Sequence, residues 1–288
     1  MNKTTFAGIP QEYATLETSK IVIIPIPYDD TVTWKKGAQY GPNAFLKASQ
    51  YLELYDIETN SEVYKRGIFL ASPINKFNNS PTKMIHNIYS ITKKYLLKNK
   101  FVTIIGGEHS ISIGSIRAFG ELFENLSILH MDAHADLRPI YNNNPYNHAC
   151  SMYEASKKYT LVQIGIRSMD IQETKYVQKG NIFYNHDIYN NKTWMEQAIN
   201  KLSNNIFISI DIDVFDPGIA PSTGTPEPGG MLWYNTLLFL KQVFTTKQVV
   251  GFDIVELSPN NNEYSTDFLV AKLFYKLLSY KYELKLDI

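Results

Sequence analysis

The sequence predicts an α/β fold, specifically a three-layer αβα sandwich built on a mostly parallel sheet. The first observation is a series of short apolar runs, rich in Ile and Val, that stop at polar or glycine-rich residues. The second is the helical spacing of apolar residues in the segments between these runs. Strands that alternate with helices along a chain form a parallel sheet with helices on both of its faces.

Six apolar runs have the length and β-branched content of strands that are buried on both faces. They are Ile21–Ile26, Phe101–Ile105, Leu126–Met131, Leu161–Ile166, Ile206–Ile210 and Val249–Ile254. A shorter run, Ile182–Tyr184, is a seventh candidate.

Three segments between these runs place apolar residues on one helical face. They are Thr82–Lys98, Thr193–Leu202 and Asp267–Tyr280. A further helix is expected after Gly106–Ser110, because the two glycines permit a sharp turn out of the preceding strand.

Composition gives no support for several classes of function. The 288 residues include 28 basic and 28 acidic side chains, so the formal net charge is zero. Without a basic cluster, nothing electrostatic favours binding to nucleic acid or to an anionic membrane. No repeat or linker divides the chain, so we expect one domain over residues 1–288.

The N-terminus and the cysteine count predict a soluble cytoplasmic protein. Residues 1–20 lack the apolar run of a signal peptide, and no window reaches the length of a membrane helix. Cys150 is the only cysteine, so no intrachain disulfide can form, which fits a reducing compartment.

Polar side chains follow four of the predicted strands, at the point where each strand ends. In open α/β sheets, ligands bind beyond the carboxyl ends of the strands, so we expect these side chains to meet at one edge. The groups are Gly106–His109 after Phe101–Ile105, Asp132–Asp136 after Leu126–Met131, Asp211 and Asp213 after Ile206–Ile210, and Glu256 after Val249–Ile254.

The segment Asp132–Asp136 is the most informative of these groups. In an extended chain Asp132, His134 and Asp136 point to one side, because successive side chains alternate between faces. Three such groups at a buried strand end are costly without a cation or hydrogen-bond partners. A surface turn with solvated acids is the alternative, and the preceding apolar run disfavours it.

Asp211 and Asp213 repeat this spacing after a second apolar run. An Asp-x-Asp pair alone is a weak signal, but its position matches that of the first cluster. His109 follows a glycine turn that could instead cradle a phosphate at a helix N-terminus. No Walker lysine follows that turn, and an imidazole suits a metal better than a phosphate.

Two imidazoles and four carboxylates exceed the needs of one metal ion. Two divalent cations would balance the four negative charges, and bridging carboxylates could serve both ions. Oxygen-rich ligation with few imidazoles and no thiolate favours Mn²⁺ or Mg²⁺ over Zn²⁺. The candidate ligands are His109, Asp132, His134, Asp136, Asp211 and Asp213.

The remaining histidines leave alternatives open. His130 lies inside a predicted strand and is interpreted as a core residue or as a support for the ligands. The neighbours of His148 do not compel a catalytic role. His86 and His186 are interpreted as ordinary helix and loop residues.

Several long motifs in this sequence resemble those of the ureohydrolase family, which contains arginases and agmatinases. The similarity extends over about residues 20–280 and is greatest to agmatinases. The segments that carry it are Pro27–Pro42 (PYDDTVTWKKGAQYGP), Gly106–Ser110 (GGEHS), Asp132–Asp136 (DAHAD), Ser209–Pro217 (SIDIDVFDP), Gly224–Gly230 (GTPEPGG) and Asp253–Pro259 (DIVELSP).

The resemblance implies an arginase-like fold with two Mn²⁺ ions per chain. His109 and Asp136 would complete the coordination of the first ion, and His134 and Asp213 that of the second. Asp132 and Asp211 would bridge the two ions. Family members are usually trimers or hexamers, so the resemblance also implies a homo-oligomer.

The resemblance further implies hydrolysis of a guanidino group. A water activated by the metal ions would attack the guanidinium carbon, leaving urea and an amine. Glu256 would bind the guanidinium, Asp136 would hydrogen-bond the nucleophile, and His148, close to the substrate, would relay a proton to the leaving amine.

The substrate suggested by the resemblance is agmatine, which would give putrescine and urea in polyamine biosynthesis. The loop Leu137–Tyr141 lacks the small polar residues that an arginine α-carboxylate and α-amine need, although Arg138 could pair with a carboxylate. Arginine, guanidinobutyrate or guanidine are alternative substrates. A catalytically silent binding protein is a further alternative, which the intact set of six ligands and Glu256 disfavours.

Overall fold

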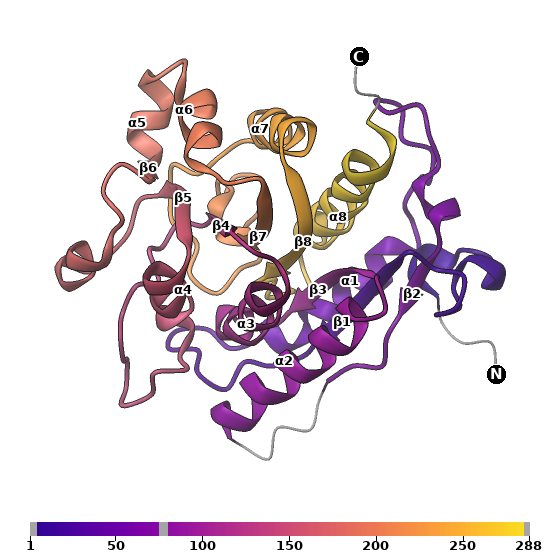
Figure 1. Ribbon diagram of the computed structural model, residues 1–288, viewed down its shortest axis with the longest axis horizontal. Helices are drawn as coiled ribbons and strands as arrows, with labels where there is room; N and C mark the ends of the chain where they lie inside the picture. The colour runs from indigo at the N-terminus through magenta and orange to yellow at the C-terminus, as the bar shows by residue number, and fades with distance from the viewer. Residues whose placement is uncertain (1–4, 75–79, 285–288) are drawn as a thin grey trace.

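The computed structural model describes residues 5–74 and 80–284. Its centre is an eight-stranded sheet with the order β2-β1-β3-β8-β7-β4-β5-β6, in which all neighbouring strands run parallel (Figure 1). The strands are β1 (Ile21–Ile26), β2 (Ile68–Leu70), β3 (Phe101–Gly106), β4 (Leu126–Met131), β5 (Thr160–Ile166), β6 (Ile182–Tyr184), β7 (Asn205–Asp211) and β8 (Gln248–Val255).

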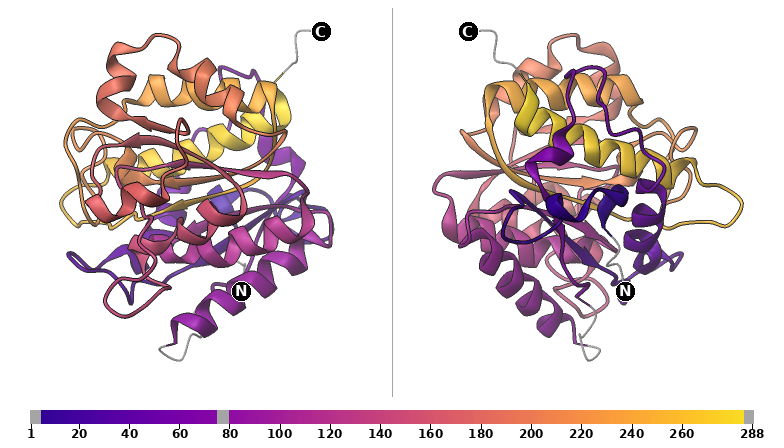
Figure 2. Two further views of the ribbon diagram at one scale, coloured as in Figure 1. Left: turned by 60° about the vertical axis from the view of Figure 1, so that its left-hand side comes forward. Right: turned by 90° about the vertical axis from the view of Figure 1, so that its right-hand side faces the viewer.

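Helices cover both faces of the sheet, which gives three layers (Figure 2). On one face α1, α6, α7 and α8 share a core with the sheet, and on the other face α2, α3 and α4 do so. The helices are α1 (Gly41–Ser49), α2 (Pro81–Leu96), α3 (Ser112–Leu122), α4 (Tyr153–Lys158), α5 (Asn185–Asn190), α6 (Trp194–Lys201), α7 (Trp233–Thr246) and α8 (Ser265–Glu283).

Local sequence explains the start of helix α2. The Ser80 hydroxyl accepts a hydrogen bond from the Lys83 N–H, and Pro81 fills the first turn, where its missing N–H is not needed. The face that carries Met84 and Ile88 is buried against the sheet, as the helical spacing predicted.

The predicted α/β fold is confirmed. All seven predicted strands form, with ends that differ by one residue or none, and the three predicted helices correspond to α2, α6 and α8. The edge strand β2 and the helices α1, α4, α5 and α7 were not assigned from the sequence. Within the described part of the chain, no helix is long and apolar enough to cross a lipid bilayer.

The strand order places β3, β8, β7 and β4 side by side at the centre of the sheet. The chain leaves β3, runs through α3 and enters β4, and it later returns to fill the space between them with β7 and β8. The four strand ends that carry the candidate ligands are therefore neighbours.

Candidate active site

A tight turn after β3 brings His109 to the central edge of the sheet. Gly107 passes so close to Tyr28 that a β-carbon on Gly107 would lie 1.9 Å from the Tyr28 carbonyl oxygen. The Gly107 N–H donates to the carbonyl of Ile26, and its carbonyl accepts from the Glu256 N–H. Gly107 therefore joins the turns that follow β1, β3 and β8.

Gly107→Ala is expected to lower the free energy of unfolding by about 3 kcal/mol, because the added methyl meets backbone that cannot move aside. Gly229→Ala is the matched comparison. Nothing lies within 4 Å of a β-carbon there, and only the φ of 77° opposes it, so a loss of about 1 kcal/mol is expected. Urea denaturation measures both variants, and equal losses would contradict the steric argument.

The first group of candidate ligands surrounds His109. Its Nδ1 lies 3.0 Å from Asp132 Oδ2, 3.2 Å from Asp211 Oδ2 and 3.4 Å from Asp136 Oδ2. Nδ1 is buried and makes no hydrogen bond within the described residues. Three carboxylates thus converge on one unsatisfied ring nitrogen.

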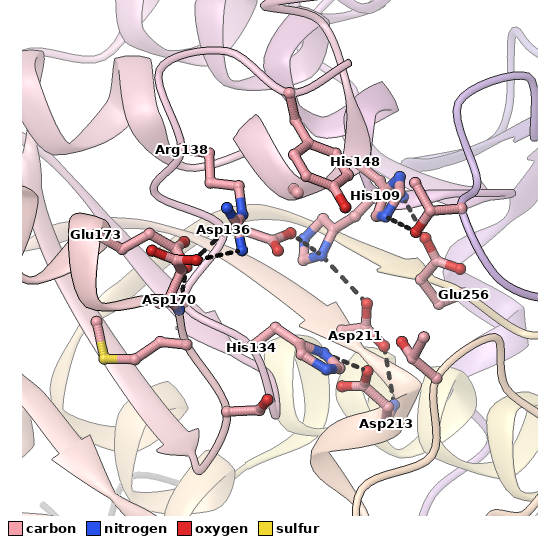
Figure 3. Close-up of a pocket in the computed structure, with 17 residues that line it drawn as sticks. His109, His134, Asp136, Arg138, His148, Asp170, Glu173, Asp211, Asp213 and Glu256 are labelled. Carbon is pink, nitrogen blue, oxygen red and sulfur yellow. Dashed lines mark hydrogen bonds and ion pairs between the residues drawn. The ribbon is translucent and has the colours of Figure 1, made fainter.

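The second group surrounds His134. Its Nδ1 lies 2.9 Å from Asp213 Oδ2 and 3.5 Å from Asp132 Oδ1. Asp132 therefore presents one carboxylate oxygen to each group, which is the arrangement of a bridging ligand (Figure 3 shows the surrounding side chains).

The spacing of these atoms fits metal ions. Ligand atoms about 2.1 Å from one octahedral cation lie roughly 3 Å from each other, and that is the spacing found around both histidines. Burial and then the charge of Asp132 raise the pKa of Asp136 to about 8, so the carboxylates repel one another in the absence of cations. Oxygen-rich donors with two imidazoles suit Mn²⁺ or Mg²⁺.

Two details of the ligand segments differ from the extended chain that the sequence predicted. Asp136 has a φ of 53°, so a left-handed residue rather than strand alternation turns its carboxylate toward His109. Asp213 lies in a 3₁₀ helix, Ile212–Val214, whose first turn is capped by the Asp211 carboxylate accepting from the Asp213 N–H.

Buried polar side chains orient the candidate ligands from behind. His109 Nε2 lies 2.9 Å from the Ser209 hydroxyl, which donates to the Asp253 carboxylate at 2.7 Å. His130 Nε2 lies 2.8 Å from Asp132 Oδ2, which fits its interpretation as a support. Partners of this kind fix the tautomer and orientation of metal-binding histidines. Ser209 and Asp253 belong to the motifs but had no role assigned from the sequence.

A cavity of about 190 Å³ opens onto these ligands. Glu256 and His148 lie at one side, and Arg138, Asp170 and Glu173 lie at the opposite side (Figure 3). The Glu256 side chain is nearly buried and marks the closed end of the cavity, whereas Asp170 and Arg138 are about one-third exposed and mark an entrance.

Glu256 follows β8 in a left-handed conformation, with a φ of 65°. Its Oε1 accepts a hydrogen bond from the backbone N–H of His109 at 2.8 Å. Burial, followed by the charge of Glu108, raises the pKa of Glu256 above its ordinary value. A cation in the cavity would stabilise the charged form of Glu256 and so oppose this rise in its pKa.

His148 lines the cavity from a 3₁₀ helix, His148–Cys150. Its Nδ1 lies 2.9 Å from the carbonyl oxygen of Thr31, which can only accept, so Nδ1 carries the proton. Burial lowers the pKa of His148 to about 4. The ring is therefore neutral near pH 7, and its Nε2, which lies 3.5 Å from the Thr33 hydroxyl, carries no proton.

The acids at the entrance were missed by the sequence interpretation. Glu173 accepts from the backbone N–H groups of Leu137 and Asp170, both at 2.7 Å, so it ties the entrance to the ligand segment. Asp170 pairs with Arg138 at 3.3 Å. Their position in the sequence could have identified them, because both acids follow β5 and the carboxyl end of that strand also borders the site.

The sequence and the fold of this chain are similar to those of known proteins. A sequence profile of the Arginase family matches residues 19–279. The chain belongs to the arginase family. It is 36% identical to an N(1)-aminopropylagmatine ureohydrolase of Synechocystis sp., over 90% of this chain and 88% of that protein, and 34% identical to one of Thermus thermophilus, over 92% and 91%. The crystal structure of an agmatine ureohydrolase of Thermoplasma volcanium superposes with a TM-score of 0.86 at 27% identity, covering 98% and 96% of the two chains.

The protein is therefore an arginase-family hydrolase, and its relatives are named N(1)-aminopropylagmatine ureohydrolase and agmatinase. The family depends on a pair of metal ions, and this chain has two groups of His and Asp side chains that share Asp132. The prediction of an enzyme of this family is confirmed.

Proposed function

We propose that this arginase-family protein releases urea from a linear guanidinoalkylamine without a carboxylate, namely agmatine or its N(1)-aminopropyl derivative. Two Mn²⁺ ions would bind at its paired ligand groups. The proposed ligands are His109, Asp132, His134, Asp136, Asp211 and Asp213.

The ion pair between Arg138 and Asp170 is the observation that favours a substrate without a carboxylate. Among the described side chains that line the cavity, Arg138 is the one Lys or Arg. Its guanidinium pairs with Asp170 and lies 4.8 Å from the ring centroid of Tyr141. The α-carboxylate of arginine would have to displace Asp170 to reach it, whereas an ammonium group would be attracted to the acids at the entrance.

The aminopropyl derivative of agmatine is the second candidate because of the entrance and the relatives. Its longer tail carries two ammonium groups, and the entrance offers the carboxylate of Asp170, which is about one-third exposed. The two relatives above carry the name of this activity. Hydrolysis would leave the N-aminopropyl derivative of putrescine.

The side chains at the closed end would position and protonate the substrate. Metal ions held by the six proposed ligands would supply a water of lowered pKa as the nucleophile for the guanidinium carbon. Glu256 pairs with the planar guanidinium, since a carboxylate can accept two parallel N–H groups. Asp136, whose Oδ2 accepts from the Ser151 hydroxyl, hydrogen-bonds the attacking water. His148 Nε2 takes up a proton released by the attacking water and passes it to the leaving amine.

The Mn²⁺-loaded protein is expected to turn over agmatine with a kcat/KM at least about tenfold above that for arginine, a difference of roughly 1.4 kcal/mol in activation free energy. A urea-release assay compares agmatine, N(1)-aminopropylagmatine, arginine, guanidinobutyrate and guanidine. Equal or better turnover of a substrate with a carboxylate would overturn the assignment, and Arg138→Ala would then show whether Arg138 binds that group.

Activity is expected to rise with pH through neutrality into the alkaline range. Protons compete with metal ions for the six ligands, and the attacking water must lose a proton. The pKa of His148 is lowered to about 4, so its neutral form is present throughout this range and does not limit the rate. A pH series of kcat/KM at saturating Mn²⁺ tests this, and a maximum below about pH 6, where free imidazole is charged, would contradict it.

A further inference from the structure

A loop from the N-terminal part of the chain contacts His148. Residues 27–37 connect β1 with a short 3₁₀ helix, and Thr31 lies within this loop. Thr31 contacts His148 through three atom pairs, the longest of which joins its hydroxyl oxygen to His148 Nδ1 at 3.5 Å. Its carbonyl oxygen accepts from His148 Nδ1 at 2.9 Å, and its hydroxyl oxygen accepts from the His148 backbone N–H at 3.0 Å.

Glu108 holds Thr31 from the other side. Its two carboxylate oxygens accept from the Thr31 N–H at 2.7 Å and from the Thr31 hydroxyl at 2.5 Å. The Ser110 hydroxyl also donates to Glu108, and this carboxylate is fully buried. Because the Thr31 hydroxyl donates to Glu108, its oxygen lone pairs are left to face the backbone of His148.

These contacts decide which nitrogen of His148 faces the substrate. With its proton held on Nδ1 by the Thr31 carbonyl, the neutral ring offers an unprotonated Nε2 to the cavity. His148 Nε2 lies 3.5 Å from the hydroxyl of Thr33, which belongs to the same loop as Thr31. Were Thr31 to shift, the ring could rotate or exchange tautomers, and Nε2 would lose its role.

We propose that Thr31, anchored by Glu108, is a positioning residue that fixes the orientation and the Nδ1–H tautomer of His148. This inference rests on the proposed function, in which His148 relays the proton. Thr31 acts through His148 and does not touch the substrate. Its loss therefore lowers turnover while substrate binding and metal content are retained.

Thr31→Val removes the hydroxyl and keeps the shape of the side chain. It is expected to lower kcat about tenfold, as loss of an orienting partner typically does, while KM changes less than about twofold and Mn²⁺ content stays at the wild-type value. Thr31→Ser restores the hydroxyl and should recover most of the lost kcat. Thr245→Val, which changes an exposed threonine on α7, is the matched control and should match the wild type.

A double-mutant cycle separates positioning from general destabilisation. In a His148→Ala background, Thr31→Val should cause no further loss of kcat beyond about twofold, since coupled residues are not additive. Full additivity of the two losses would overturn the proposal. An increase in KM or a loss of Mn²⁺ equal to the loss of kcat would overturn it as well.

The tautomer can be observed without any activity. In protein labelled with ¹⁵N-histidine and loaded with diamagnetic Mg²⁺, the ring signals missing from His148→Ala identify His148. An Nδ1–H tautomer that is lost or mixed in Thr31→Val supports the proposal, whereas an Nε2–H tautomer in the wild type, or an unchanged Nδ1–H tautomer in Thr31→Val, overturns it. If the wild type releases no urea from any guanidino compound, the proposed function fails, and this measurement still decides the role of Thr31.

Discussion

Asp132→Asn is expected to lower kcat by at least about 1000-fold, which corresponds to roughly 4 kcal/mol of activation free energy. Among the described carboxylates, Asp132 lies within 3.5 Å of a ring nitrogen in each ligand group, with Oδ2 3.0 Å from His109 Nδ1 and Oδ1 3.5 Å from His134 Nδ1. The amide keeps the shape but removes one negative charge and replaces an acceptor with a donor. Both ions would therefore be held more weakly.

Metal content separates this effect from unfolding. After Mn²⁺ loading and desalting, the wild type should retain about two ions per chain, and Asp132→Asn should retain fewer. His109→Ala should lose one ion preferentially, because His109 belongs to only one group. Asp187→Asn, on an exposed carboxylate, is the matched control for the change of charge. A wild-type stoichiometry of one ion would remove the two-metal arrangement altogether.

The central strands were predictable because burial leaves a plain pattern in the sequence. Strands β1, β3 and β4 are buried at every position, so each is mainly apolar in sequence, although β3 includes Thr103 and β4 includes Ser127 and His130. The edge strand β2 has only three residues and two of them are half-buried, so it carries no such pattern. Helix α7 begins with Trp233 and is apolar over much of its surface, which obscured the helical spacing.

The candidate ligands were predictable because parallel strands bring their carboxyl ends to one edge. The turns themselves were not, because the left-handed conformations of Asp136 and Glu256 leave no signal in residue type. Thr31 was not predictable either. It lies 117 residues from His148 in sequence, and only the packing of its loop onto the site brings the two together.

Glu256→Gln is expected to lower kcat/KM by at least about 100-fold, or roughly 2.7 kcal/mol, while two Mn²⁺ ions remain bound. Glu256 Oε1 accepts from the backbone N–H of His109, and a glutamine oxygen can accept the same hydrogen bond. The loop that carries His109 should therefore stay in place. What is lost is the negative charge and one of the two acceptors that a guanidinium needs.

The position of Glu256 predicts how the loss of kcat/KM in Glu256→Gln depends on the substrate. The carboxylate of Glu256 is buried at the closed end of the cavity, where a charge-assisted pair is stronger than in water. All guanidino substrates share this group, so Glu256→Gln should lower kcat/KM by a similar factor for agmatine and for N(1)-aminopropylagmatine. A change at the entrance, such as Asp170→Asn, should instead discriminate between them, because their tails differ there. Glu124→Gln, on an exposed glutamate, is the control for the substitution itself. If Glu256→Gln kept a near-normal kcat/KM with both substrates, the guanidinium would have to be held by another group, and the assignment of the closed end of the cavity would be wrong.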